Sequence, residues 1–400
     1  MIEIDTPQKN RQVEKGIVDN LLSHHLAEGH AIGMWQLPHT TKKNIIIGTD
    51  GVQLLNEVAL EELGPGFIMA PFDSLKEKFF IKANETYELE NGECISCQNP
   101  SLDFAESSGE NSKKSIALPP FHFFKGVAAG LEIGQQEYMA LVSKTIRQIA
   151  EGKMEKLVPA RNKKIVLPDH FDLTEAFIQL CLSYPNAFVS LVSSPETGTW
   201  MGASPELLVN LQGESRFRTV AVAGTQPLQP HTDLKSVAWT EKEIEEQALV
   251  SRYIINCFKK IRLREFEEHG PKTWQAGNIL HLKTDFEVDM VATNFPQLGS
   301  VMLKLLHPTS AVCGMPRDES IQFLRENERF DRQFFSGFLG PVNYQHESHI
   351  YVNLRCMQWL KQEAILYAGA GVTLDSTPQK EWEETELKLT TLLKVIYPQP

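Results

Sequence analysis

Residues 366–388 read LYAGAGVTLDSTPQKEWEETELK and combine a strand, a glycine-rich segment and a helix in one short stretch. The apolar run 364–367 predicts a buried strand. The Gly-Ala-Gly segment at 369–371 follows, where backbone can approach a ligand with no side chain in the way. Thr377 and Pro378 predict a helix start, with Thr as the N-cap and Pro in the first helical position.

The helix that begins at Pro378 carries Glu381, Glu384 and Lys388 at i, i+3 and i+7, so all three lie on one face. Two carboxylates and an ammonium beside a bare glycine segment can hold a divalent cation and an anionic ligand together. The same pattern also describes a solvated face with an ion pair between Glu384 and Lys388 worth about 0.3–0.5 kcal/mol. This stretch alone leaves both interpretations open.

Composition places the chain among ordinary globular proteins. It has 400 residues, of which 42% are hydrophobic and 22% charged, enough for one large or two ordinary domains. The net charge of −12 argues against a nucleic-acid-binding protein, which needs a basic face. The sequence has no apolar run of ~18 residues and no signal-peptide core at its start, so we expect a cytoplasmic protein without a membrane partner. Six cysteines in 400 residues suit reduced thiols.

The N-terminal part of the chain contains fewer motifs that indicate a function. Cys94 and Cys97 form a CxxC motif without a second pair downstream, so a zinc or redox role does not follow from the motif alone. Residues 99–116 are rich in Ser, Glu, Asn and Gly and predict a flexible loop. We expect residues 1–118 to be a variable N-terminal part of the same fold, and residues 119–396 to form the catalytic region.

The periodicity of apolar residues predicts an α+β fold with large, mainly antiparallel sheets, because strands cluster without strict alternation with helices. The alternation places His281 and Arg355 on the polar faces of two strands. Helices are predicted at 10–29, 135–151 and 240–260, a strand or a strand pair at 156–167, and strands at 44–48, 78–83, 187–193, 199–202, 207–211, 217–223, 279–286 and 350–356.

A second helix start repeats the acidic pattern of the first. Thr240 and Glu243 form a capping box, which explains Glu243 structurally but does not explain Glu246 one turn later on the same face. If this helix faced the one with Glu381 and Glu384, four carboxylates would repel one another. A hard cation would relieve that repulsion, and Mg²⁺ takes one or two direct carboxylates plus waters and ligand oxygens.

Two further residues are candidates for proton transfer. Glu206 follows a tight turn after an apolar strand and is either a solvent-exposed turn residue or a partly buried acid with a raised pKa. Lys156 precedes an apolar pair and is either exposed or a base whose pKa is lowered by burial. A glycine turn at 223–225 also offers backbone N–H groups to an anion.

These segments together resemble the chorismate-utilising enzymes of menaquinone, siderophore and tryptophan biosynthesis. The resemblance covers about residues 120–395 and implies the fold of anthranilate synthase component I, with large antiparallel sheets and helices outside. The motifs that carry it, in this order, are AVAGTQP, the helix start with Glu243 and Glu246, ILHLKTDF, LHPTSAVCGMP, FFSGFLGPV, VNLRC and the stretch 367–388.

The resemblance implies a role for each matching residue. Chorismate would be the substrate and Mg²⁺ the cofactor, with Glu246 and Glu384 as direct metal ligands and Glu243 and Glu381 as neighbours that act through water. The substrate would be held by residues from several segments. These are the side chains of Arg355, Lys388 and His281 and the backbone at Gly224, Thr225, Ala311 and Gly369.

Two positions bear on which nucleophile is added. Aminodeoxychorismate synthases carry a lysine where this chain has Ala223, and ammonia-using members lack a base where Lys156 stands. Water-adding members have that lysine, although Pro159 replaces the commoner serine near it. The resemblance thus implies that Lys156 activates a water at C2 and that Glu206 protonates the departing C4 hydroxyl, giving isochorismate. It also implies no glutaminase subunit, and we expect a monomer.

Other functions remain open at this stage. Salicylate synthases share the lysine and metal but go on to eliminate pyruvate, and they tend to carry a threonine where this chain has Ala311-Val312. An ammonia-using anthranilate or aminodeoxychorismate synthase and a carboxylate-binding relative without activity are further alternatives. Nothing in the sequence chooses between menaquinone and siderophore biosynthesis.

Overall fold

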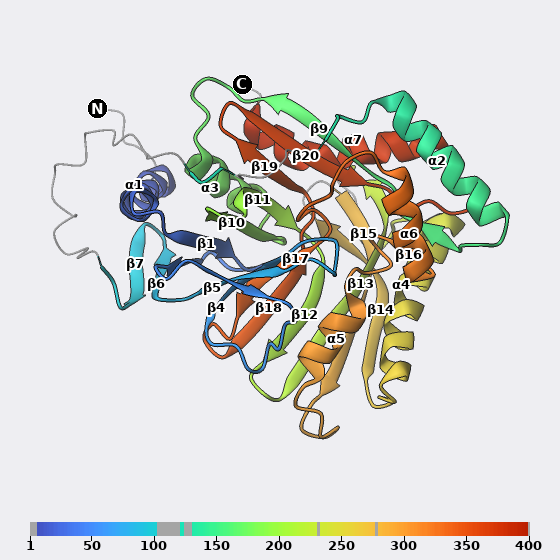
Figure 1. The fold of residues 1–400 in the computed structure, drawn as a ribbon, viewed down its shortest axis with the longest axis horizontal. Helices are drawn as coiled ribbons and strands as arrows, with labels where there is room; N and C mark the ends of the chain where they lie inside the picture. Colours follow the sequence, from blue (N-terminus) through green and yellow to red (C-terminus); the bar gives the residue numbers. More distant parts are fainter. Residues whose placement is uncertain (1–5, 102–120, 124–129, 230–232, 277–278, 399–400) are drawn as a thin grey trace.

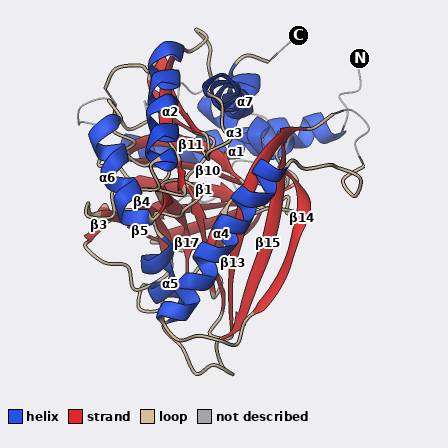
Figure 2. Ribbon diagram, turned by 90° about the vertical axis from the view of Figure 1, so that its right-hand side faces the viewer, coloured by secondary structure: helices blue, strands red, loops and turns tan. Residues whose placement is uncertain are grey.

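The structure is a computed structural model that describes residues 6–101, 121–123, 130–229, 233–276 and 279–398. Within these ranges, two large antiparallel sheets pack against each other and helices lie outside them (Figures 1 and 2). The predicted α+β class is confirmed. The predicted loop at 99–116 and the boundary at 118 fall largely outside the described residues.

The first sheet is continuous across nine strands in the described part of the chain, and every neighbouring pair is antiparallel. In spatial order they are β7 (Glu93–Gln98), β6 (Glu85–Glu90), β2 (Lys43–Gly48), β1 (Ala31–Gln36), β10 (Phe188–Ser194), β11 (Gly198–Ser204), β19 (Cys356–Leu360), β20 (Glu363–Gly369) and β9 (Ala160–Val166).

The second sheet also has nine described strands, again all antiparallel. In spatial order they are β14 (Glu267–Ala276), β15 (Ile279–Asp289), β13 (Arg216–Pro227), β12 (Leu207–Gln212), β18 (Glu347–Val352), β17 (Phe338–Val342), β4 (Gly66–Ala70), β5 (Lys78–Lys82) and β3 (Val52–Leu55). A two-stranded ribbon pairs β8 (Lys156–Leu157) with β16 (Gly314–Met315).

Alternation within single strands explains the layered core. In β1, Ala31 and Trp35 face the core between the two sheets, whereas Ile32 and Met34 face the core under the helices. Successive side chains of a strand point to opposite faces, so a strand covered on both faces is apolar throughout. The stacking of Phe188 on Tyr351, with ring centroids 4.3 Å apart, joins the first sheet to the second.

Helices cover the outer faces of both sheets (Figure 2). Three of them pack on the first sheet and two on the second, while one lies against another helix and one beside the β16 ribbon. They are α1 (Thr6–Ala27), α3 (Leu173–Ser183) and α7 (Pro378–Ile396) on the first sheet, α4 (Glu241–Lys260) and α5 (Leu298–Leu306) on the second, α2 (Gln135–Ala150) on α7, and α6 (Arg317–Asn327) at the ribbon. None of the described helices has the length and apolar character to cross a bilayer.

Most predicted elements are present with small shifts at their ends, but the predicted strand at 350–356 is wrong. Strand β18 ends at Val352 in the second sheet, and β19 starts at Cys356 in the first. Between them Arg355 has a φ of +48°, and the Asn353 N–H donates to the Gly337 carbonyl at 2.9 Å. The chain passes from the second sheet to the first at this point. The alternation of apolar and polar residues continues through the crossing, so it cannot reveal the change of sheet. At 156–167, where a strand or a strand pair was predicted, the structure has the pair, with β8 and β9 separated by Val158 and Pro159.

Candidate active site

A cleft opens where the chain crosses between the two sheets. The β11–β12 crossing carries Glu206, and the β18–β19 crossing carries Arg355. Among the sequence-predicted residues, nine line this cleft: Glu206, Gly224, Thr225, Glu246, His281, Ala311, Arg355, Gly369 and Lys388. Residues separated by up to 182 positions in the chain therefore share one space.

Glu206 is 5% exposed, so it is not the solvent-exposed turn residue of the alternative interpretation. Burial raises the pKa of Glu206 to about 7, although the Thr309 hydroxyl and the charges of Lys156 and Lys388 oppose the rise. The Thr309 hydroxyl donates to Glu206 Oε1 at 3.2 Å and fixes the carboxyl group. A carboxyl group with such a pKa carries its proton in a large fraction of molecules near neutral pH, as a general acid must.

Lys156 is fully buried, and its Nζ lies 2.9 Å from Glu246 Oε1. Burial alone would raise the pKa of Glu246, but Lys156 and then Lys242 hold it below its ordinary value. Gly371 makes this contact possible, because a Cβ at that position would lie 2.1 Å from Glu246 Oε1 and 3.1 Å from Lys156 Cε. The last glycine of the Gly-Ala-Gly segment thus leaves room for the lysine and the carboxylate.

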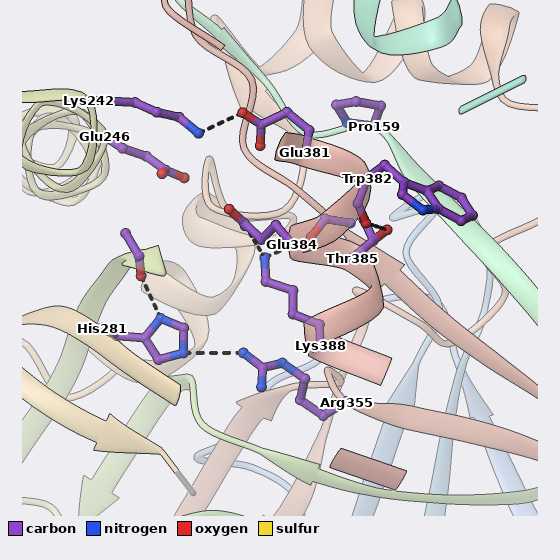
Figure 3. A network of polar contacts seen from close by, with 12 residues as sticks. Pro159, Lys242, Glu246, His281, Arg355, Glu381, Trp382, Glu384, Thr385 and Lys388 are labelled. Atoms are coloured by element: carbon purple, nitrogen blue, oxygen red, sulfur yellow. Dashed lines mark hydrogen bonds and ion pairs between the residues drawn. The ribbon is translucent and has the colours of Figure 1, made fainter. Parts of the chain in front are cut away.

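The helices α4 and α7 face each other across a group of carboxylates and lysines (Figure 3). Lys242 Nζ lies 2.7 Å from Glu381 Oε1, and Lys388 Nζ lies 2.7 Å from Glu384 Oε1. Burial, and then repulsion from Glu384, raise the pKa of Glu381 to about 7 against the effect of Lys242. Glu381 and Glu384 therefore repel each other within α7, and Lys242 of α4 compensates part of that repulsion.

Glu243 lies apart from this group in its hydrogen bonding. Its Oε2 accepts from the Thr240 N–H at 2.8 Å and also from the Thr240 hydroxyl, as expected for a capping box. Glu243 still borders the site, because a Cβ on Gly224 would lie 3.0 Å from its Cβ. At the start of α7, by contrast, the Thr377 side chain makes no capping hydrogen bond.

The opposite end of the cleft is built around His281 and Arg355 (Figure 3). Arg355 Nη2 lies 3.2 Å from His281 Nε2, and His281 Nδ1 lies 2.6 Å from the Gly224 carbonyl oxygen. An arginine only donates, so Nε2 accepts and the ring proton is assigned to Nδ1. Burial, and then the charge of Arg355, lower the pKa of His281 to about 3. The imidazole is therefore neutral, and Arg355 supplies positive charge for an anionic ligand.

The backbone positions also border the cleft. Gly224 has a φ of +69° in a bulge of β13, where the register shifts between Ala223 and Gln226. The bulge turns the Gly224 carbonyl toward His281. The Gly369 carbonyl accepts from Lys388 Nζ at 2.8 Å. Two backbone carbonyls thus hold the side chains of His281 and Lys388 at the cleft.

Sequence reasoning missed two cations at this site. Arg332 is 3% exposed and donates to the Val312 carbonyl at 2.8 Å and to the Val158 carbonyl at 2.7 Å, which ties two walls of the cleft together. Glu328 pairs with it four residues earlier, but α6 has already ended, so helical spacing gave no signal. Lys242 lies next to Glu243 in sequence, and only the tertiary structure brings its Nζ to Glu381 of α7.

Comparison with known proteins shows which family the chain belongs to. The family model for chorismate binding enzymes matches residues 104–397. The chain belongs to the chorismate-binding enzyme family. The "Isochorismate synthase EntC" of Escherichia coli (strain K12) is 30% identical over 269 residues, which span 65% of this chain and 67% of that protein.

Solved structures show the same fold. MenF of Escherichia coli, the menaquinone-specific isochorismate synthase, superposes with a TM-score of 0.73 at 19% identity, covering 94% of this chain and 91% of MenF. Anthranilate synthase component I from Streptococcus pneumoniae superposes with a TM-score of 0.65 at 16% identity, covering 90% of this chain and 89% of that one. The fold of this chorismate-binding enzyme is thus shared by proteins named for different reactions, so the fold alone does not decide the reaction.

Proposed function

We propose that this chorismate-binding enzyme is an isochorismate synthase, an isomerase that adds water at C2 of chorismate and releases the C4 hydroxyl. The observation that carries the proposal is a pair of buried groups: Glu206 lines the cleft, and Lys156 lies 2.9 Å from Glu246, which also lines it. Similarity to the isochorismate synthase EntC supports the same reaction. The product would enter menaquinone or siderophore biosynthesis.

In this proposal the two groups act on opposite sides of the substrate ring. The amine form of Lys156 takes a proton from the water that attacks C2. Protonated Glu206 gives its proton to the hydroxyl that leaves C4, and its raised pKa keeps that proton available near pH 7. Arg355 and Lys388 hold substrate carboxylates, and neutral His281 lines the pocket near the ring.

We assign Mg²⁺ to the carboxylates of α4 and α7, with Glu246 and Glu384 as direct ligands and Glu243 and Glu381 acting through water. The donor chemistry fits a hard cation. Glu381 Oε2 is buried without a hydrogen-bond partner among the described residues, so a cation beside it would be stabilised. Lysines now contact three of the four carboxylates, and no described cluster of three acidic, His or Cys side chains is already arranged to hold a metal. When bound, Mg²⁺ would anchor the ring carboxylate and withdraw electron density from the diene.

The proposal is tested by incubating the purified protein with chorismate and Mg²⁺ and separating the products. We expect isochorismate without pyruvate and without any requirement for ammonia or a glutaminase subunit. Salicylate with pyruvate would instead show a salicylate synthase, and ammonia-dependent product would show an anthranilate-type enzyme. Binding of chorismate without turnover would show that the protein binds chorismate but does not convert it.

We expect EDTA to abolish turnover, because a bound metal supplies several kcal/mol of charge stabilisation in the transition state. At about 1.4 kcal/mol per factor of ten, the rate should fall by at least ~10²-fold. The measurement is the initial rate of isochorismate formation before and after chelation, with restoration by added Mg²⁺. EDTA already saturated with Mg²⁺ is the matched control. An unchanged rate in free EDTA would remove the metal from the proposal.

We expect kcat/KM to fall as the pH rises through about 7, because Glu206 acts as an acid only while it is protonated. Its pKa is raised to about 7, so the active form dominates below that pH and is lost above it. The pH–rate profile measures the alkaline limb. The infrared carboxyl band that differs between the wild-type protein and Glu206→Gln should titrate over the same range. A band that disappears near pH 4.5 would contradict the assignment.

A further inference from the structure

A pair of thiols lies on the outer edge of the first sheet, apart from the cleft. Cys94 and Cys97 belong to β7, which pairs with β6 on one side and ends the sheet. Figure 1 shows β7 beside α1 at one end of the molecule, while α4 lies at the other. In a regular strand, residues three apart point to opposite faces, so a CxxC motif would separate its thiols.

A bulge in β7 removes that separation. Leu89 is paired with Cys94 and Tyr87 with Cys97, while the register shifts between them and leaves Ile95 as the extra residue. Leu89 and Tyr87 both point into the core beneath α1, so Cys94 and Cys97 share that face. Positions two apart on a strand are separated by about 6.7 Å. Disulfides join Cα atoms about 4.4–6.8 Å apart, most often about 5.5–6 Å, so this spacing lies at the upper end of the range that a disulfide bridges.

The surroundings of the two sulfur atoms agree with this register. Burial, and then the neighbouring Cys97 thiol, raise the pKa of Cys94, so the two thiols are close enough to interact. Cys97 is exposed and Cys94 is half-buried. The remaining cysteines, Cys181, Cys257, Cys313 and Cys356, are all buried.

We infer that Cys94 and Cys97 form a reversible dithiol–disulfide pair that reacts with small-molecule disulfides such as glutathione disulfide. The exposed Cys97 loses its proton and attacks one sulfur, breaking the glutathione S–S bond and releasing one glutathione, which takes up a proton. Cys94 then attacks the mixed disulfide in the same way and releases the second glutathione. The two cysteines are oxidised to one disulfide, and one glutathione disulfide is reduced to two glutathione molecules.

The test equilibrates the folded, full-length protein with mixtures of reduced and oxidised glutathione, blocks free thiols by alkylation, and analyses the peptide containing residues 94–97 by mass spectrometry. We expect an internal disulfide whose ratio to the dithiol follows [GSSG]/[GSH]², as a two-electron exchange requires. Cys94→Ser should stop at one glutathione attached to Cys97. Glutathione adducts without an internal disulfide in the wild-type protein would overturn the inference.

A matched control exchanges the position of one thiol. The double variant Ser96→Cys/Cys97→Ser keeps two cysteines in the strand but moves one to the position opposite Glu88, on the other face. Residues 96 and 97 are both exposed, so the exchange disturbs no core contact. We expect the internal disulfide to form at least ~10-fold less readily in this variant, since the thiols now lie on opposite faces of the strand. Equal closure in both proteins would show that the bulge does not pair the thiols.

Discussion

Replacing Lys156 with alanine is expected to abolish isochorismate formation while chorismate still binds. A positioned general base contributes about 10²–10⁴-fold to rate, and Lys156 is fully buried with its Nζ 2.9 Å from Glu246, a residue that lines the cleft. The measurement compares kcat for the variant and the wild-type protein and determines chorismate affinity by calorimetry. A loss of kcat with retained affinity is the signature of a base rather than of a binding residue.

Two further variants separate catalysis from folding. Lys153→Ala removes an exposed lysine from the same segment, where it pairs with Glu151, and should leave the rate unchanged. Lys156→Met keeps the length and apolar stem of the buried side chain while removing the ammonium. It should be as inactive as Lys156→Ala but closer to the wild-type protein in thermal stability. If Lys156→Met kept most of the activity, another group would have to be the base.

Glu206→Gln is expected to cause the second large loss, again by about 10²–10⁴-fold in kcat. The amide has nearly the same shape as the carboxyl group and can still accept a hydrogen bond from Thr309, but it cannot donate a proton to the leaving hydroxyl. The residual rate should lack the alkaline limb near pH 7 that the wild-type acid produces. Near-normal turnover in this variant would disprove the role of Glu206.

The control for this change is Glu214→Gln, which alters an exposed carboxylate in the turn between β12 and β13. It should leave both the rate and the pH profile unchanged. Because Glu206 is buried, its neutral replacement should also fold well, and thermal unfolding will check this. If the Glu206→Gln protein unfolds at a lower temperature than the wild-type protein, its chorismate affinity will show whether the site is intact.

Much of the fold could be predicted from local patterns. Residues 44–48 and 364–367 are apolar because each strand is covered on both faces, and this signal lies in neighbouring positions of the chain. Helix α4 was predicted from its capping box, which the structure contains. The strand at 350–356 could not be predicted correctly, since Arg355 continues the alternation while its backbone turns between the sheets.

The sequence by itself determined the fold class, the order of the family motifs and the chemical types available for the site. Tertiary structure alone decided that Lys156 would lie 2.9 Å from Glu246, that Lys242 would meet Glu381, and that a bulge would bring Cys94 and Cys97 to one face. The physical reason is that periodicity reports how a side chain lies on its own element. Distances between elements, and the burial that shifts the pKa of Glu206, arise only when those elements pack together.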